Sequence, residues 1–165
     1  MVHRLLLFCT AFLLAVSQAT AFEAELLGKR DVDLPQYKSE QGMILFDEKG
    51  AQTEFAIDYG SYKKNRVLLL MRDTGARTET DSTIFEILQV VRVTKPKGMD
   101  LYSVGCYLRP ATEAPEGQYV LAYARFTPEG NGVPSAISGG WMFDWNTRRI
   151  VSVPSQKIDC REPGD

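Results

Sequence analysis

The chain carries short apolar blocks separated by polar turns, and this pattern predicts β-strands. Met43–Phe46 and Thr53–Ile57 flank Asp47-Glu48-Lys49-Gly50, a sequence typical of a hairpin turn with glycine at the position that needs a positive φ. Val67–Met71 is a continuous apolar run bounded by arginines, which indicates a strand buried on both faces. The first half of the chain therefore predicts at least three strands.

The second half continues the same pattern. Leu101–Leu108 alternates and places Cys106 on its apolar face. Gln118–Phe126 is apolar on both faces, which predicts a central strand. Trp141–Trp145 and Arg148–Val153 flank a short polar turn and predict a second hairpin.

Residues 81–93 fit two descriptions. Thr83-Ile84-Phe85-Glu86 matches a helix capping box. Four apolar residues also fall on one helical face: Ile84, Ile87, Leu88 and Val91. The valines at the end of the segment, however, are residues that prefer strands. We predict a short helix near residues 81–91 that passes into an extended segment.

These elements predict a mainly β fold in a single small domain, with antiparallel strands arranged as a sheet, a sandwich or a partly open barrel. An α+β arrangement is the alternative. Residues 22–42 are polar, contain Pro35 and lack a clear pattern, so we interpret them as an N-terminal arm. The β-rich domain is expected to span residues 43–165.

Residues 1–21 have the three parts of a secretory signal peptide. Arg4 supplies a positive charge, Leu5–Val16 is an apolar run, and Ala19-Thr20-Ala21 matches a small-residue cleavage site. The run is shorter than the roughly 17–25 apolar residues that span a bilayer. We expect cleavage before Phe22 and a periplasmic or secreted product that is free of the membrane.

Cleavage would remove Cys9 and leave Cys106 and Cys160. Two cysteines in an exported chain of this size most simply form one disulfide. Two unpaired buried thiols are the alternative. The bond would tie a strand in the middle of the chain to the C-terminal tail.

Charge and histidine content exclude several classes of function. The net charge of the full chain is −2, which does not suit a nucleic-acid-binding protein. The one histidine is His3, which the signal peptide would carry away. A mature chain without histidine has no Ser-His-Asp triad and no zinc site built on histidine. We expect no cofactor and no metal.

Aromatic residues in the predicted strands are the candidate interaction surface. Alternation places Trp141, Phe143 and Trp145 on one side of a strand, where they would stack on a sugar or an apolar ligand. Tyr119 and Tyr123 share a face of another strand. The same spacing is also what a core face looks like, so core packing is the alternative for all five residues.

Two acidic positions are candidates for catalysis. Asp73-Thr74-Gly75-Ala76 follows an apolar strand, as in small aspartic proteases of the retroviral type, but the chain contains no second Asp-Thr-Gly or Asp-Ser-Gly. Asp144 lies between Met142 and Trp145, and such neighbours would raise its pKa. For the Asp73 motif we favour the alternative that it forms a turn. For Asp144 we favour the alternative that it is an outward-facing residue.

Short motifs run through residues 81–160 in a definite order. They are an acidic residue before an apolar stretch, a Gly-Cys pair, two further strands, a turn and a terminal cysteine: Asp81 with Ile84–Val93, Gly105-Cys106, Tyr119–Ala124, Trp141–Asp144, Thr147-Arg148 and Cys160. In this order they resemble a loose group of small exported Gram-negative bacterial proteins of uncharacterised function. The resemblance implies export and pairing of the two cysteines. It implies no activity, substrate or cofactor.

Together these observations favour a non-enzymatic exported domain that binds a protein, a glycan or an apolar ligand. One alternative is an envelope structural or protein-interaction domain without a small ligand. The other is a hydrolase whose chemistry rests on carboxylates. The expected partner is an envelope protein or a glycan rather than a nucleic acid.

Overall fold

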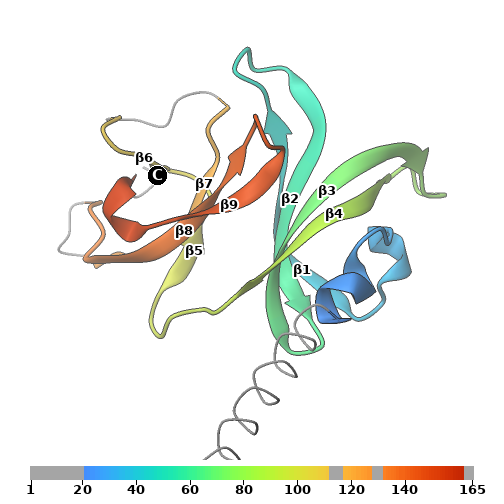
Figure 1. The fold of residues 1–165 in the computed structure, drawn as a ribbon, viewed down its shortest axis with the longest axis horizontal. Coiled ribbons are helices and arrows are strands. Elements are labelled where there is room, and N and C mark those ends of the chain that lie inside the picture. Colours follow the sequence, from blue (N-terminus) through green and yellow to red (C-terminus); the bar gives the residue numbers. More distant parts are fainter. Residues whose placement is uncertain (1–20, 112–116, 128–131, 162–165) are drawn as a thin grey trace, which may run out of the picture.

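The computed structural model describes residues 21–111, 117–127 and 132–161 (Figure 1). Apart from Ala21, the predicted signal peptide lies outside the described residues. Residues 21–26 are helical. The elements that follow are η1 (Asp31–Asp33), β1 (Tyr37–Phe46), β2 (Gln52–Tyr62), β3 (Asn65–Arg77), β4 (Thr83–Val93), β5 (Asp100–Tyr102), β6 (Cys106–Leu108), β7 (Val120–Arg125), β8 (Ala136–Asp144), β9 (Arg149–Val153), η3 (Ser155–Lys157) and β10 (Ile158–Cys160).

The strands form two four-stranded sheets and one small ribbon. Sheet A has the order β1-β2-β3-β4, sheet B has the order β5-β7-β8-β9, and β6 pairs with β10. Every strand pair is antiparallel. The predicted fold class, a mainly β antiparallel domain, is therefore confirmed. None of the helices in the described part of the chain has the length and apolar character needed to cross a membrane.

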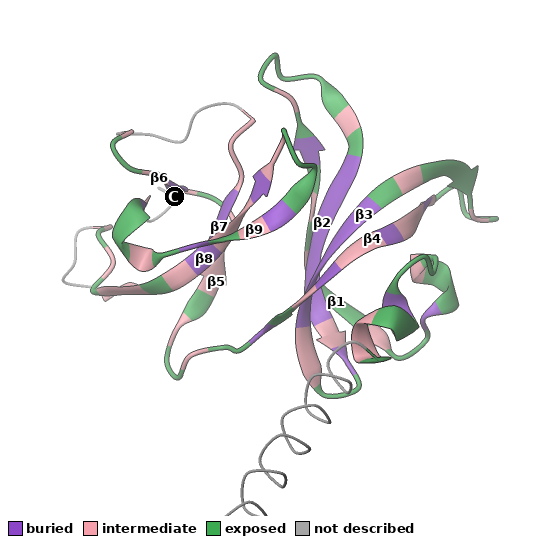
Figure 2. Ribbon diagram, in the orientation of Figure 1, coloured by how far each residue is buried: buried purple, intermediate pink, exposed green. Residues whose placement is uncertain are grey.

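The inner faces of sheets A and B pack on each other and form the main core. Its buried residues come from both sheets: Leu45, Phe55, Ile57, Tyr59, Leu68, Leu70 and Val93 from sheet A, and Leu121, Phe143 and Ile150 from sheet B. Figure 2 shows the buried positions running along the middle of both sheets. Burial of this apolar surface is the main force that holds the sheets together.

Residues 21–36 cover part of the outer face of sheet A. Leu26 and Leu34 are buried there against Val67, Leu69 and other apolar side chains of the sheet. Backbone hydrogen bonds of 2.9 Å join Gly28 and Lys29 to Ile87 at the edge of β4. Residues 22–42, which lack a clear pattern in the sequence, thus contain η1, the start of β1 and two core leucines.

The β6–β10 ribbon covers the outer face of sheet B. Cys106 and Cys160 are directly opposite each other in the ribbon and form a disulfide, as the sequence predicts. Both are buried against Val120, Ala122 and Ile158. The bond therefore closes a third, smaller core on this side of the molecule.

The helix predicted near residues 81–91 is wrong, because Thr83–Val93 is strand β4. The register of β3 and β4 shifts between Leu70, which pairs with Gln89, and Met71, which pairs with Ile87. This bulge adds one residue to β4 and interrupts its two-residue alternation. Strand β4 is also buried on both faces, since Ile87 and Val90 pack on the outer side of sheet A and Val93 packs in the core between the sheets. The bulge and this two-sided burial together place buried residues at every third position, Ile84, Ile87, Val90 and Val93, which imitates a helical face.

Gln89 joins the two sheets at their adjacent edges. Its side-chain nitrogen donates a 3.0 Å hydrogen bond to the Ile150 carbonyl, and its side-chain oxygen accepts a 2.8 Å bond from the Ile150 N–H. The amide side chain thus takes the place of a neighbouring strand for one residue of β9. This contact holds β9 beside β4.

Candidate functional site

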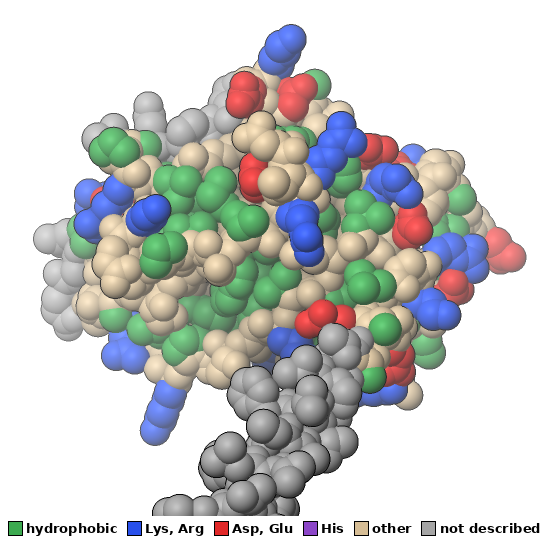
Figure 3. Space-filling model, viewed as in Figure 1, with side chains coloured by type: hydrophobic (Ala, Val, Ile, Leu, Met, Phe, Trp, Pro, Cys, Tyr) green, Lys and Arg blue, Asp and Glu red, His purple; other side chains and the backbone are tan. Residues whose placement is uncertain are grey.

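An open cleft lies on the inner side of sheet B, beside the segment that connects β4 to β5. We call it the Trp141 cleft. Its volume is about 540 Å³, and it is lined by Thr94, Pro96, Tyr123, Ser138, Gly139, Gly140, Trp141, Ser152 and Val153. Figure 3 shows hydrophobic side chains gathered on the face where sheets A and B approach each other. The volume is in the range of small-molecule sites.

The strand register brings the two aromatic rings of the cleft together. Tyr123 on β7 is opposite Gly139 on β8, and Trp141 lies two residues further along β8 on the same face. A Cβ atom at Gly139 would lie 3.5 Å from the Val153 carbonyl oxygen, on the neighbouring strand β9. The rings of Tyr123 and Trp141 meet edge to face, with centroids 5.8 Å apart. Gly139 has a φ of +126°, a conformation that favours glycine.

Tyr123 forms the rigid side of the cleft. Its side chain is 1% exposed, and its hydroxyl lies 3.0 Å from the hydroxyl of Tyr59 on β2. Arg66 in turn donates a 3.1 Å hydrogen bond to the Tyr59 oxygen. Burial raises the pKa of Tyr123 well above its usual range, so its hydroxyl stays protonated at neutral pH. The ring is therefore held by sheet A as well as by sheet B.

Hydroxyl groups and backbone make up the polar part of the cleft. Thr94, Ser138 and Ser152 contribute the hydroxyls. Among the described residues that line the cleft, none is an acid, a base or a cation. Trp141 is only partly buried, so its ring is available to a ligand. The arrangement suits a neutral molecule with an apolar face and hydrogen-bonding groups at its rim.

The other three predicted aromatic residues lie outside this cleft. Phe143 is 1% exposed and belongs to the core between the sheets. Trp145 donates a 2.7 Å hydrogen bond from its ring nitrogen to the Gly117 carbonyl, and Tyr119 accepts a 2.6 Å bond from the Phe46 N–H. Phe143 and Trp145 also line a smaller hollow of about 270 Å³ at the other end of β8. Of the five residues, the structure therefore brings Tyr123 and Trp141 together in the Trp141 cleft.

Asp144 lies beside the smaller hollow and stabilises the β8–β9 turn. It accepts a 2.7 Å hydrogen bond from the Thr147 hydroxyl and a 3.0 Å bond from the Asn146 N–H. These bonds lower the pKa of Asp144, opposite to the increase that the sequence suggested. Its carboxylate is thus an Asx-turn acceptor rather than a proton donor at neutral pH.

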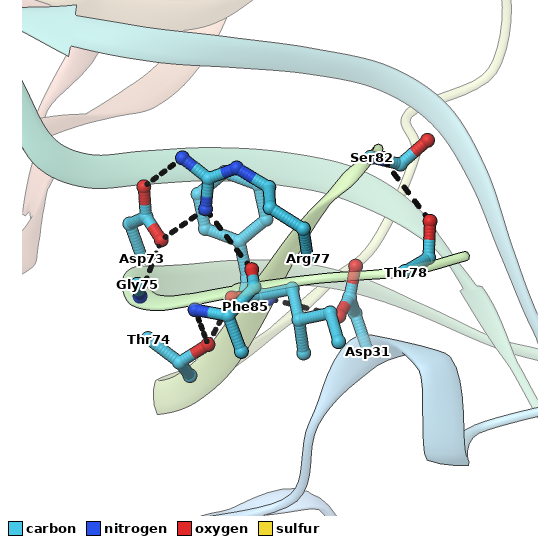
Figure 4. A network of polar contacts seen from close by, with 10 residues as sticks. Asp31, Asp73, Thr74, Gly75, Arg77, Thr78, Ser82 and Phe85 are labelled. Atoms are coloured by element: carbon cyan, nitrogen blue, oxygen red, sulfur yellow. Dashed lines mark hydrogen bonds and ion pairs between the residues drawn. The ribbon is translucent and has the colours of Figure 1, made fainter. Parts of the chain in front are cut away.

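The Asp-Thr-Gly-Ala motif does not form the turn that the sequence favours but lies near the end of strand β3, where the pairing with β4 is irregular between Asp73 and Arg77. Asp73 accepts a 2.7 Å hydrogen bond from the Gly75 N–H and pairs with Arg77, while Thr74 donates a 2.7 Å bond to the Ile84 carbonyl (Figure 4). The bond from Gly75 and the positive charge of Arg77 lower the pKa of Asp73. The motif therefore makes local contacts within β3 and with β4 instead of sharing a proton between two carboxyls.

Comparison with known proteins identifies no relative of this chain. The chain matches no protein-family model, no curated protein and no solved structure. The resemblance of residues 81–160 to exported bacterial proteins therefore stays a prediction. Within the described ranges, no group of three or more His, Cys, Asp or Glu side chains is arranged to hold a metal ion. The geometry of the Trp141 cleft is thus the basis for assigning a function.

Proposed function

We propose that the protein is a non-enzymatic exported domain that binds a neutral glycan in the Trp141 cleft. The observation that carries this proposal is the composition of the cleft, in which a partly exposed indole lines the wall together with three short hydroxyl side chains. The C–H groups of a sugar ring stack on an aromatic face, while its hydroxyl groups bond to polar atoms at the rim. A cleft without a charge suits a neutral sugar better than a charged ligand.

The same composition argues for binding without chemical conversion. Glycoside hydrolysis uses two carboxyl groups that flank the scissile bond. The described lining of the cleft contains hydroxyls but no acid or base to activate them. A bound sugar would therefore be released from the cleft without chemical change.

Replacing Trp141 with alanine should weaken sugar binding by about tenfold or more, because stacking of this kind contributes on the order of 1 kcal/mol beyond the buried area. The measurement is isothermal titration of the protein with linear oligosaccharides of glucose, galactose and N-acetylglucosamine. Trp145→Phe is the matched control, because Trp145 is the other tryptophan and lies outside the cleft. The control also leaves Trp141 as the single fluorescent indole, so its emission should shift on binding.

Two results would contradict the glycan proposal. One is the absence of saturable binding by the unaltered protein across all three sugar series. The other is binding that Trp141→Ala and Trp145→Phe weaken equally, which would place the sugar elsewhere. Either result would leave a protein-interaction domain as the better description.

Export is the second part of the proposal. It is supported by the signal-like pattern of residues 1–21 and by the buried Cys106–Cys160 disulfide, since such bonds persist in oxidising compartments. When the full chain is expressed in a Gram-negative cell, we expect it in the periplasmic fraction with Phe22 as its first residue. N-terminal sequencing checks this expectation. Material that begins at Met1 and remains in the cytoplasm would contradict it.

A further inference from the structure

A second hollow lies on the outer face of sheet A, where residues 21–36 border it through Asp31. Asp58 forms one wall of this hollow, which we call the Asp58 cavity. Asp58 is 7% exposed, and among the described residues it is the one buried side chain that carries a charge. None of the ion pairs in the described part of the chain includes it. Burial of a carboxylate without a cation is unfavourable.

The cavity has a volume of about 380 Å³ and two kinds of wall. Asp58 and Asp31 supply carboxyl groups, and Ile44, Met71 and Phe85 supply apolar surface. None of the described lining residues is Lys or Arg. The Asp31 carboxylate accepts a 3.0 Å hydrogen bond from the Phe85 N–H, which fixes it at the rim (Figure 4). The cavity is therefore electronegative at one end and apolar along its length.

Gly42 leaves the carboxyl group of Asp58 uncovered. It lies directly opposite Asp58 in the register of β1 and β2, and a Cβ atom at this position would stand 3.6 Å from Oδ1 of Asp58. The backbone of Gly42 is outside the left-handed region, so the chain conformation does not require glycine there. A larger residue would fit, and it would cover the carboxyl group.

The neighbours that donate hydrogen bonds to Asp58 are neutral. Ser39 donates a 2.8 Å bond to Oδ1 of Asp58. The buried hydroxyl of Tyr37 lies beside the same carboxyl group, and burial together with the charge of Asp58 raises the pKa of Tyr37. Burial also raises the pKa of Asp58, while these two hydroxyl groups favour its ionised form. Neither hydroxyl supplies the positive charge that a buried carboxylate favours.

We propose that the Asp58 cavity binds an organic cation, a primary ammonium group attached to an apolar chain or ring. The ammonium group would donate to the carboxylate of Asp58. Its apolar part would lie along Met71 and Phe85, which line the same cavity. A hollow of this size accommodates a small amine. This site is independent of the neutral Trp141 cleft, because the Asp58 cavity lies on the outer face of sheet A and the cleft lies on the inner side of sheet B.

The test compares 2-phenylethylamine with 2-phenylethanol, which has similar shape but no charge, by isothermal titration at neutral pH. The amine is protonated there, since alkylamines have pKa values near that of lysine, about 10.4. We expect the amine to bind the unaltered protein at least about tenfold more tightly than the alcohol. A hydrogen bond between charged groups contributes enough free energy for a difference of this size. Equal affinities, or no binding of the amine, would overturn the proposal.

Three variants locate the site. Asp58→Asn keeps the shape of the side chain, removes its charge and should abolish the preference for the amine. Gly42→Leu should weaken binding of both compounds, since its side chain would lie over the carboxyl group. Glu54→Gln removes an exposed acid from the same strand outside the cavity and should change neither affinity. If all three variants bind the amine as the unaltered protein does, Asp58 does not hold the cation and the proposal fails.

Loss of folding can be told apart from loss of binding, because the two cavity variants change different properties: Asp58→Asn removes a charge and Gly42→Leu adds a side chain. Thermal unfolding of Asp58→Asn and Gly42→Leu checks that each remains cooperative. Even if one of them fails to fold, the other still separates binding at Asp58 from binding elsewhere. Loss of sugar binding at Trp141 would leave the amine result unaffected, so each proposal can fail without the other.

Discussion

Replacing both Cys106 and Cys160 with serine should lower the free energy of unfolding by about 4 kcal/mol, the chain-entropy value for a loop of this size. The two residues are 54 positions apart in the sequence. The reduced chain has many more unfolded conformations, and β6 and β10 pair through two residue pairs besides the pair that the bond joins. A loss of this size is a large fraction of the stability of a small domain. Urea unfolding of the double variant measures it.

The control for this prediction is the unaltered protein unfolded with a reducing agent present, which should show the same loss as the double variant. Reduction leaves every side chain in place apart from the S–S bond itself. A double variant with the unaltered unfolding midpoint would show that the bond adds no stability. A double variant that is far less stable than the reduced protein would instead assign the loss to the serine hydroxyls in the small core.

Replacing Phe143 with alanine should cost about 3–5 kcal/mol, the usual range for a buried phenylalanine. The ring is 1% exposed and lies between Phe55 and Trp145, with centroid distances of 5.5 Å and 4.7 Å. Its removal would leave a void where sheet A meets sheet B. Urea unfolding followed by circular dichroism measures the loss.

Phe46→Ala is the matched control, because Phe46 at the end of β1 is 41% exposed. We expect its effect to stay within about 0.5 kcal/mol, as for most surface substitutions. If the two variants lose similar amounts of stability, Phe143 does not have the core role that its burial indicates. The comparison separates core packing from ligand contact for a residue that the sequence leaves open between the two.

The strands that could be predicted are those whose pattern depends on local chemistry. Val67–Met71 is apolar throughout because β3 is buried on both faces, against sheet B on one side and residues 21–36 on the other. The turn after β1 has Gly50 at a φ of +73°, as its sequence indicates. The sequence of strand β4 resembles that of a helix because a bulge and burial on both faces change the spacing of its buried residues. A bulge depends on the partner strand, which one sequence does not reveal.

The candidate site could be predicted only in part for a similar reason. Trp141 and Tyr123 stand out by alternation, but Thr94 and Pro96 reach the cleft from the connection that follows β4. Which connection crosses which sheet is a matter of long-range packing. The sequence does not single out Asp58 as a site residue, because its carboxyl group is left uncovered by the absence of a side chain at Gly42 on the neighbouring strand. A gap of this kind appears only once the strands are paired.

The position of the disulfide has a mechanical consequence. Strands β7, β8 and β9, which carry most of the Trp141 cleft, lie between Cys106 and Cys160 in the sequence. A force that pulls on the two ends of the chain passes through the S–S bond and bypasses this loop. Under load the strands of sheet A would unfold and extend, while the residues between Cys106 and Cys160 would add nothing to the extension. The wall of the cleft that holds Trp141 is thus shielded from tension for as long as the bond remains oxidised.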